Sequence, residues 1–155
     1  MSDGDDNILK LVDAEAPPPD DGYRLQDQIG FILRRANQRH LAIFGAHIDD
    51  LTPPQFAALA KLRDIGETSQ NQLGAQIAMD AATVKGVIDR LKARGMVKLT
   101  RHAIDKRRLL VGLTAEGRAA IERLIPLAAA ITDETLSPLT QRESETLVRL
   151  LSKIA

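Results

Sequence analysis

The chain has 155 residues, of which 44% are hydrophobic, so it can form one ordinary domain with a real core but not two large ones. Its 21 lysines and arginines balance 21 acidic residues, yet seven of the acids and only one base lie in residues 1–21. Residues 22–155 therefore hold 20 bases and 14 acids, a net charge of +6. The absence of cysteine excludes a disulfide framework, a thiolate zinc site and a cysteine nucleophile.

Other classes of protein are excluded by what the composition lacks. No apolar run approaches 18 residues and the N-terminus has no apolar signal region, so we expect a cytoplasmic protein with no membrane partner. Aromatic residues make up only 3% of the chain, too few for a base-stacking platform on single-stranded nucleic acid. The chain has no phosphate-binding glycine loop, nucleophile elbow or metal-ligand cluster, which argues against an enzyme and against a cofactor.

The first fifty residues predict an arm followed by one long helix. Residues 1–21 are acidic, contain three consecutive prolines and read as a flexible acidic arm. From Tyr23 to about Asp49, apolar residues recur at helical spacing without a proline. Such a helix is about 40 Å long at ~1.5 Å per residue, longer than a small core requires. We therefore expect it to pack on something besides its own domain.

The middle of the chain predicts a helix-turn-helix. Thr52-Pro53-Pro54-Gln55 is a capping box with proline at the first helical position, and Gly66 marks the end of that helix. Ser69-Gln70-Asn71-Gln72 is a second capping box, and Asp80 caps a third helix that runs to Arg94. The third helix has a narrow apolar stripe, formed by Val84, Val87, Ile88 and Leu91.

The remaining chain predicts a hairpin and two helices. Val97–Arg101 and Leu109–Leu113 read as strands around a charged loop, which together form a β-hairpin "wing". Thr114 caps a helix from about Ala115 to Glu134, which Pro126 should kink or interrupt. A third capping box, Thr140 to Glu143, begins a last helix with an apolar stripe of Leu147, Leu150, Leu151 and Ile154. The predicted fold class is mostly α with a small β-hairpin wing.

Residues 85–108 are strongly basic. They contain nine bases opposed by only Asp89 and Asp105, spread over the third helix and the hairpin. A surface this basic is attracted to duplex DNA by counterion release, and a helix fits the major groove. A solvated face of a globular domain is the alternative. Helix-turn-helix spacing, a basic hairpin and an acidic remainder together favour double-stranded DNA as a partner.

These residues also resemble the MarR family of bacterial transcription regulators. The resemblance is carried from Leu51 to Gly117 by an ordered set of short pieces, and the long first helix and the last two helices extend it to residues 23–155. The pieces are Leu51-Thr52-Pro53-Pro54-Gln55-Phe56, Ser69-Gln70-Asn71-Gln72-Leu73, Met79-Asp80-Ala81-Ala82-Thr83-Val84, Asp89-Arg90-Leu91, Arg94-Gly95, Asp105-Lys106-Arg107-Arg108 and Leu113-Thr114.

The resemblance implies a winged helix-turn-helix DNA-binding domain at residues 51–114, with a recognition helix at about 81–94. It implies a homodimer built by a helical dimerisation region, residues 22–50 and 115–155. It also implies a repressor of a pseudo-palindromic operator, released by a small anionic aromatic effector, an aromatic acid or a related thioester of the kind met in aromatic catabolism. The rival from another class is a winged-helix protein–protein interaction module without specific DNA binding.

Ten residues are candidates for DNA contact: Ser69, Ala82, Thr83, Lys85, Gly86, Arg90, Arg101, Asp105, Arg107 and Arg108. Thr83 could contact DNA or bond back to its own helix, and Arg90 could contact phosphate or pair with Asp89. Ser69 caps a helix, or places that helix's N–H groups on a phosphate. The resemblance puts Asp105 and Arg107 in the wing motif, where an ion pair from Asp105 to a neighbouring arginine would shape the loop. Gly86 departs from the family, which often has a long side chain there.

Arg35, His40 and Phe44 are the candidates for effector binding. They lie on the long helix, where an anionic ligand would favour an arginine or a histidine. The alternative is an exposed basic face or a face toward a second subunit. His40 and His47 share a helix face but lie about 10 Å apart along the axis, too far for one metal ion to bridge.

Overall fold

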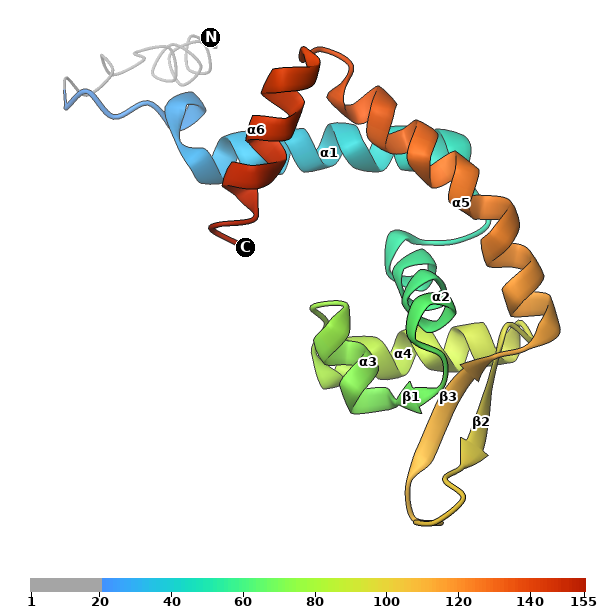
Figure 1. Ribbon diagram of the computed structural model, residues 1–155. Helices are drawn as coiled ribbons and strands as arrows, with labels where there is room; N and C mark the ends of the chain where they lie inside the picture. The colour runs from blue at the N-terminus through green and yellow to red at the C-terminus, as the bar shows by residue number, and fades with distance from the viewer. Residues whose placement is uncertain (1–20) are drawn as a thin grey trace, which may run out of the picture. The chain divides into compact units, whose positions relative to one another are not determined.

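The structure is a computed structural model that describes residues 21–155 (Figure 1). These residues fall into two units, 21–35 and 36–155, and the division lies inside the first α-helix. The predicted acidic arm, apart from Asp21, lies outside the described residues. None of the helices in residues 21–155 combines the length and the apolar character needed to cross a bilayer.

The first long helix begins later than its sequence pattern predicts. A 3₁₀ turn, Leu25–Asp27, is followed by extended Gln28 (φ −83°, ψ 134°), and α1 then spans Ile29–His47. The start predicted at Tyr23 is therefore wrong. The 3₁₀ turn buries none of its residues, and helices gain most of their stability from packing an apolar face. The chain before Ile29 lacks that gain.

The three central helices begin where the sequence predicts, and the third ends at Ala93, one residue before the predicted Arg94. They are α2 (Pro53–Ile65), α3 (Gln70–Gln76) and α4 (Ala81–Ala93). Thr52 and Ser69 both form the predicted capping boxes, and Asp80 caps α4 by accepting from the backbone N–H of Thr83 at 2.7 Å. Gly66 ends α2 with φ 75°, a conformation that glycine adopts without steric cost.

The wing is part of a three-stranded antiparallel sheet in the order β1-β3-β2. Strands β2 (Val97–Arg101) and β3 (Leu109–Leu113) coincide with the two predicted strands, and Leu99 pairs with Val111. The short strand β1 (Thr68–Ser69) pairs with the other edge of β3. Strand β1 was not predicted from the sequence, because two residues are too few for any periodicity.

Helix α5 (Ala115–Leu136) follows the sheet directly and runs without a break through Pro126. The predicted interruption is therefore wrong, because the residues on both sides of Pro126, including Ile121, Leu124 and Ile131, are buried and hold the helix together. A kink at Pro126, the alternative outcome, stays a prediction. The helix starts against the end of the turn before β2. A Cβ on Gly117 would lie 1.9 Å from the carbonyl oxygen of Met96, so only glycine permits this approach.

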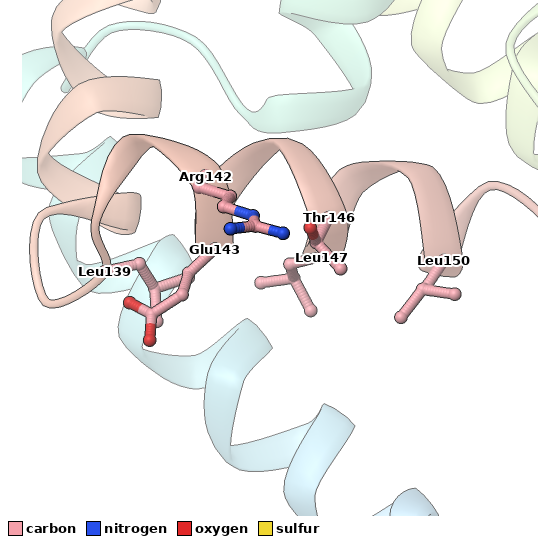
Figure 2. Close-up of a pocket in the computed structure, with 6 residues that line it drawn as sticks. All are labelled: Leu139, Arg142, Glu143, Thr146, Leu147 and Leu150. Atoms are coloured by element: carbon pink, nitrogen blue, oxygen red, sulfur yellow. The ribbon is translucent and has the colours of Figure 1, made fainter.

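The last helix, α6 (Gln141–Leu151), presents an exposed apolar groove. Its predicted capping box is present: Thr140 accepts from the backbone N–H of Glu143, and the Glu143 carboxylate accepts from that of Thr140. The groove has a volume of about 390 Å³, and Figure 2 shows Leu147 and Leu150 projecting into it from the same side of the helix. Leu139, Arg142, Glu143, Thr146, Leu147 and Leu150 line it. We call it the α6 groove.

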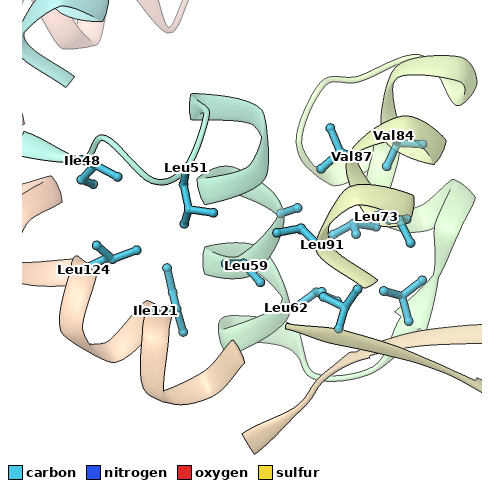
Figure 3. Packing of buried hydrophobic residues seen from close by; sticks show 14 of the residues in the cluster. Ile48, Leu51, Leu59, Leu62, Leu73, Val84, Val87, Leu91, Ile121 and Leu124 are labelled. Carbon is cyan, nitrogen blue, oxygen red and sulfur yellow. The ribbon is translucent and has the colours of Figure 1, made fainter. Parts of the chain in front are cut away.

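One hydrophobic core joins the second half of α1 to α2, α3, α4, the sheet and α5 (Figure 3), and α6 contributes none of its buried residues. Leu59 and Leu62 of α2 lie at its centre, between the α5 side chains Ile121 and Leu124 on one side and Leu73 and Leu91 on the other. The predicted stripe of α4 (Val84, Val87, Ile88 and Leu91) is fully inside it. This packing fixes which face of α4 is left for solvent.

Candidate nucleic-acid interface and effector pocket

The outward face of α4 carries the predicted DNA-reading residues. Ala82, Thr83 and Lys85 are exposed, because the buried stripe places the opposite side of the helix in solvent. Asp80 precedes them as the cap. Hydrogen bonds from Thr83, first of all from its backbone N–H, hold the pKa of the Asp80 carboxyl below its usual range. The start of α4 is therefore fixed at neutral pH, and Ala82, Thr83 and Lys85 point outward from it.

The charged side chains of α4 do not form the Arg90–Asp89 pair, which was one of the two predicted alternatives for Arg90. The Lys85 ammonium pairs with Asp89 at 2.7 Å, one turn along the helix, so Asp89 has a partner other than Arg90. Arg90 makes none of the ion pairs found in residues 21–155. Its guanidinium extends back along the helix to within 3.9 Å of where a Cβ on Gly86 would lie. A free guanidinium thus rests beside Gly86 on the outward face.

The other basic candidates for DNA contact lie at the end of β2 and in the loop of the wing, residues 102–108. Arg101, Arg107 and Arg108 are exposed, and the Arg101 guanidinium donates to the Lys106 carbonyl oxygen at 3.0 Å. The Asp105 carboxylate accepts from the backbone N–H of Arg107 at 3.2 Å. Asp105 therefore shapes the loop as expected, but through a backbone hydrogen bond and not through the predicted ion pair to an arginine.

Ser69 serves as the cap of α3. Its hydroxyl accepts from the backbone N–H of Gln72 at 3.2 Å, and its backbone pairs with Leu110 in the sheet. Both of these contacts are structural. The capping interpretation of Ser69 is confirmed, and a DNA contact by the same residue stays a prediction.

A cavity of about 260 Å³ lies between α1, α2 and α5 in unit 36–155. We call it the His40 pocket; it is lined by His40, Phe44, Pro53, Phe56, Ala128, Ile131 and Thr132. Phe44 and Phe56 meet edge to face, with ring centroids 6.0 Å apart. The polar side chains in the lining are His40 and Thr132. The pocket thus offers aromatic walls and a few polar groups, the combination typical of small-molecule sites.

A cluster of polar contacts borders the His40 pocket. The Nδ1 atom of His40 lies 2.9 Å from the Thr135 hydroxyl, and His47 Nε2 lies 2.7 Å from the Glu134 carboxylate. Arg39 donates to the carbonyl oxygens of Glu134 and Thr135. These bonds join the second half of α1 to the end of α5. They also fix the orientation of the His40 ring at the pocket wall.

Of the three predicted effector residues, the structure places His40 and Phe44 together in one pocket. Arg35 belongs to the other unit, residues 21–35. There its guanidinium lies 6.0 Å from the centroid of the Phe31 ring, a cation–π arrangement that it shares with Arg34. An effector contact by Arg35 stays a prediction.

Comparison with known proteins identifies the family. Residues 51–109 match the model of the MarR family. NicR of Pseudomonas putida, an HTH-type transcriptional repressor, is 38% identical over 147 residues, which cover 94% of this chain and 93% of NicR. The chain belongs to the MarR family. Its winged helix-turn-helix, and its role as a transcription regulator, follow from this membership.

Solved structures of transcription regulators have the same fold, which agrees with the assignment to this family. A probable transcriptional regulator from Pseudomonas aeruginosa is 50% identical with a TM-score of 0.81, covering 85% of this chain and all of that protein. BpsR of Bordetella bronchiseptica is 43% identical with a TM-score of 0.82, covering 85% of this chain and 96% of BpsR. Its structure describes how 6-hydroxynicotinic acid regulates the DNA binding of BpsR.

Two residues of this MarR-family chain matter to the sites and were missed by the sequence analysis. Arg39 holds the end of α5, and His102 accepts backbone hydrogen bonds inside the wing. Arg39 stood in an arginine-rich stretch in which nothing distinguished it from Arg34 or Arg35. For His102 the available signal was its place as the first residue after a predicted strand, where side-chain acceptors commonly shape turns.

Proposed function

We propose that this MarR-family chain acts as a homodimeric repressor. It binds a pseudo-palindromic DNA operator and releases it when a small aromatic acid binds in the His40 pocket. Residues 51–114 form the DNA-binding domain, and residues 22–50 and 115–155 form the dimerisation region. The relatedness to NicR and BpsR supports the repressor role and the class of effector.

The exposed face of α4 beside the basic wing is the observation that carries the DNA-binding proposal. Ala82, Thr83 and Lys85 point outward from the first two turns of a helix whose other face is locked in the core. An α-helix fits the major groove, and the narrow wing can follow the backbone into the neighbouring minor groove. The exposed arginines of the wing, Arg101, Arg107 and Arg108, supply the charge for phosphate contacts.

The α6 groove is where we expect a second copy of the chain to pack. Leu147, Val148, Leu150 and Ile154 are large hydrophobic residues left exposed on this helix and the turn after it. A helix of 11 residues is marginal in isolation, so its stability requires a partner for its apolar face. A dimer would also bring two recognition helices to the two half-sites of a palindromic operator.

The dimensions of the His40 pocket favour a single-ring effector. Its volume of about 260 Å³ lies below the ~300–1,000 Å³ of pockets that enclose drug-sized ligands. A monocyclic acid such as 6-hydroxynicotinic acid therefore suits it better than a thioester with a long carrier. Phe44 and Phe56 would contact the ring, and the His40 imidazole and Thr132 hydroxyl would bond its polar groups.

The test is a fluorescence anisotropy titration of operator DNA at several salt concentrations. If the dimer neutralises about eight phosphates, log K against log salt falls with a slope of about −7. A slope near zero would contradict the proposal. The rival, a protein-interaction module, is favoured if replacing Lys85, Arg101 and Arg107 together leaves DNA affinity unchanged, because a protein-binding wing does not require these bases.

A further inference from the structure

His102 occupies the start of the wing loop and is half-buried there. Its ring nitrogen Nδ1 accepts from the backbone N–H of Ile104 at 3.3 Å and from that of Asp105 at 3.1 Å. Its own backbone N–H donates to the Arg108 carbonyl oxygen at 2.9 Å. The ring and the backbone of one residue thus hold both the start and the end of the loop.

These contacts specify the chemical form of the ring. A histidine nitrogen accepts a hydrogen bond only when it carries no proton, so Nδ1 is bare and the proton of the neutral ring lies on Nε2. Asparagine and aspartate side chains make the same contact with backbone N–H groups two and three residues ahead. His102 therefore performs in this loop the task that an Asx residue performs in many turns.

The loop is continuous with the residues proposed to meet DNA. The backbone N–H of Asp105 donates to the His102 ring. Asp105 in turn accepts two hydrogen bonds: its carboxylate accepts from the backbone N–H of Arg107, and its carbonyl oxygen accepts from the backbone N–H of Arg108. The backbone positions of both arginines thus depend on a chain of hydrogen bonds that begins at His102. Four exposed cationic residues lie in the loop or next to it: Arg101, Lys106, Arg107 and Arg108. Their repulsion favours an open loop, and a neutral ring opposes it without adding a fifth charge.

We propose that His102 is a positioning residue of the wing: its Nε2–H tautomer folds residues 103–108 so that Arg107 and Arg108 face the DNA backbone. This role rests on the proposed DNA-binding function. It does not require the ring itself to contact DNA. Substitutions can therefore distinguish a ring that positions the loop from a ring that binds DNA. H102N keeps a side-chain acceptor for the two N–H groups, whereas H102A removes it.

The first arm of the experiment uses the protein without DNA. In ¹⁵N-labelled wild type, the ring nitrogens should show an unprotonated Nδ1 and a protonated Nε2 at neutral pH. The Ile104 and Asp105 amides should exchange slowly with solvent in wild type and in H102N, and at least tenfold faster in H102A. A ring protonated on Nδ1, or equal exchange in all three proteins, would overturn the proposal.

The second arm measures operator affinity by anisotropy at fixed salt. We expect H102A to bind about tenfold more weakly, the loss that corresponds to about 1.4 kcal/mol, and H102N to bind within about twofold of wild type. If H102N is as weak as H102A, the ring contacts DNA directly and the positioning role is wrong. Wild-type affinity in H102A would also overturn it. If wild type shows no salt-dependent binding at all, the proposed function fails, whatever the amide exchange shows about the loop.

Discussion

Gly86 lies in the middle of α4, where a glycine costs helix stability. Glycine in a helix interior is about 1 kcal/mol less favourable than alanine, and a Cβ here would meet only the Arg90 guanidinium, at an ordinary 3.9 Å. We expect Gly86→Ala to raise the free energy of unfolding by up to ~1 kcal/mol in urea denaturation.

Gly74 provides the matched control for this substitution. A Cβ there would lie 3.1 Å from both the Met79 carbonyl oxygen and the Val84 side chain, inside the core. Gly74→Ala should therefore destabilise the protein, although both glycines are helical. Equal effects of the two substitutions would show that helix propensity, and not local space, decides both. A weaker operator affinity in Gly86→Ala would indicate that DNA approaches the backbone at Gly86.

Arg107 is an exposed wing residue whose backbone, but not its guanidinium, is fixed by the loop. We expect Arg107→Ala to weaken operator binding by about 1–3 kcal/mol and to leave the oligomeric state unchanged. Arg123→Ala removes the same charge from an exposed position on α5, outside the wing, and should change affinity little. Fluorescence anisotropy measures the operator affinity, and size-exclusion chromatography measures the oligomeric state. Equal losses in both variants would mean that net charge alone drives binding.

At the scale of single elements, α6 is the helix that most needs a partner. Leu150→Asp puts a charge into the α6 groove, and we expect it to yield monomers or insoluble protein. Gln141→Asp adds the same charge on the opposite side of the helix, in its first turn, where a carboxylate is favourable. Light scattering distinguishes the two. A soluble dimer of normal mass from Leu150→Asp would place the dimer interface elsewhere.

The packing of α2 against α5 includes an ion pair that predicts acid sensitivity. Arg63 donates to Glu122 through Nε at 2.7 Å, and this hydrogen bond, with the guanidinium charge, holds the pKa of the Glu122 carboxyl below its usual range. The pair therefore stabilises the folded state above the unfolded-state pKa, about 4.3, and this stabilisation is lost as pH falls further.

The carboxyl pKa values of Asp80 and Glu143, which take part in helix capping, are also lowered. The main cause is a backbone hydrogen bond, from Thr83 to Asp80 and from Thr140 to Glu143. We expect the melting temperature to fall steadily below about pH 4.5. The Glu122→Gln variant should have a lower melting temperature than wild type at pH 7, and its melting temperature should fall less between pH 5 and pH 3. An identical pH profile in Glu122→Gln would contradict this role of the ion pair.

At the scale of the whole molecule, the proposed function requires that effector binding change the affinity for DNA. An effector releases DNA only if it favours a spacing of the recognition helices that does not fit successive major grooves. A preference of about 100-fold between the two states, or about 2.7 kcal/mol, suffices to empty an operator held near its dissociation constant. Hydroxynicotinates, hydroxybenzoates, cinnamates and their thioesters should be scored by thermal shift and by operator release, and we expect single-ring acids to act.

His40→Ala and Arg35→Ala should each reduce this response without abolishing DNA binding in the absence of ligand. The melting temperature rises with any ligand that binds only the folded state, so a panel without a single shift would contradict the aromatic effector. A ligand that acts equally on wild type and on His40→Ala would place the effector outside the His40 pocket. Thr132→Val removes the other polar group of the lining, and we expect it to reduce the response as well.

The sequence by itself determined the features whose causes are local. Thr52, Ser69, Asp80, Thr114 and Thr140 all cap helices as predicted, because a cap needs only a hydroxyl or carboxylate next to the first free N–H groups. The bounds of β2 and β3, and the buried stripe of α4, also follow from spacing alone. The family, with its fold, could be inferred from the order of these same pieces.

Only the tertiary structure decided the features that depend on distant neighbours. Packing on both sides of Pro126 keeps α5 in one piece, and pairing with β3 creates the strand at Thr68–Ser69. The His40 pocket joins α1, α2 and α5, which lie far apart along the chain. His102 shows the same limit over a short distance: its ring reaches two amides only because the sheet folds the loop back on it. Spacing predicts which residues share a face, but contacts between faces require the folded chain.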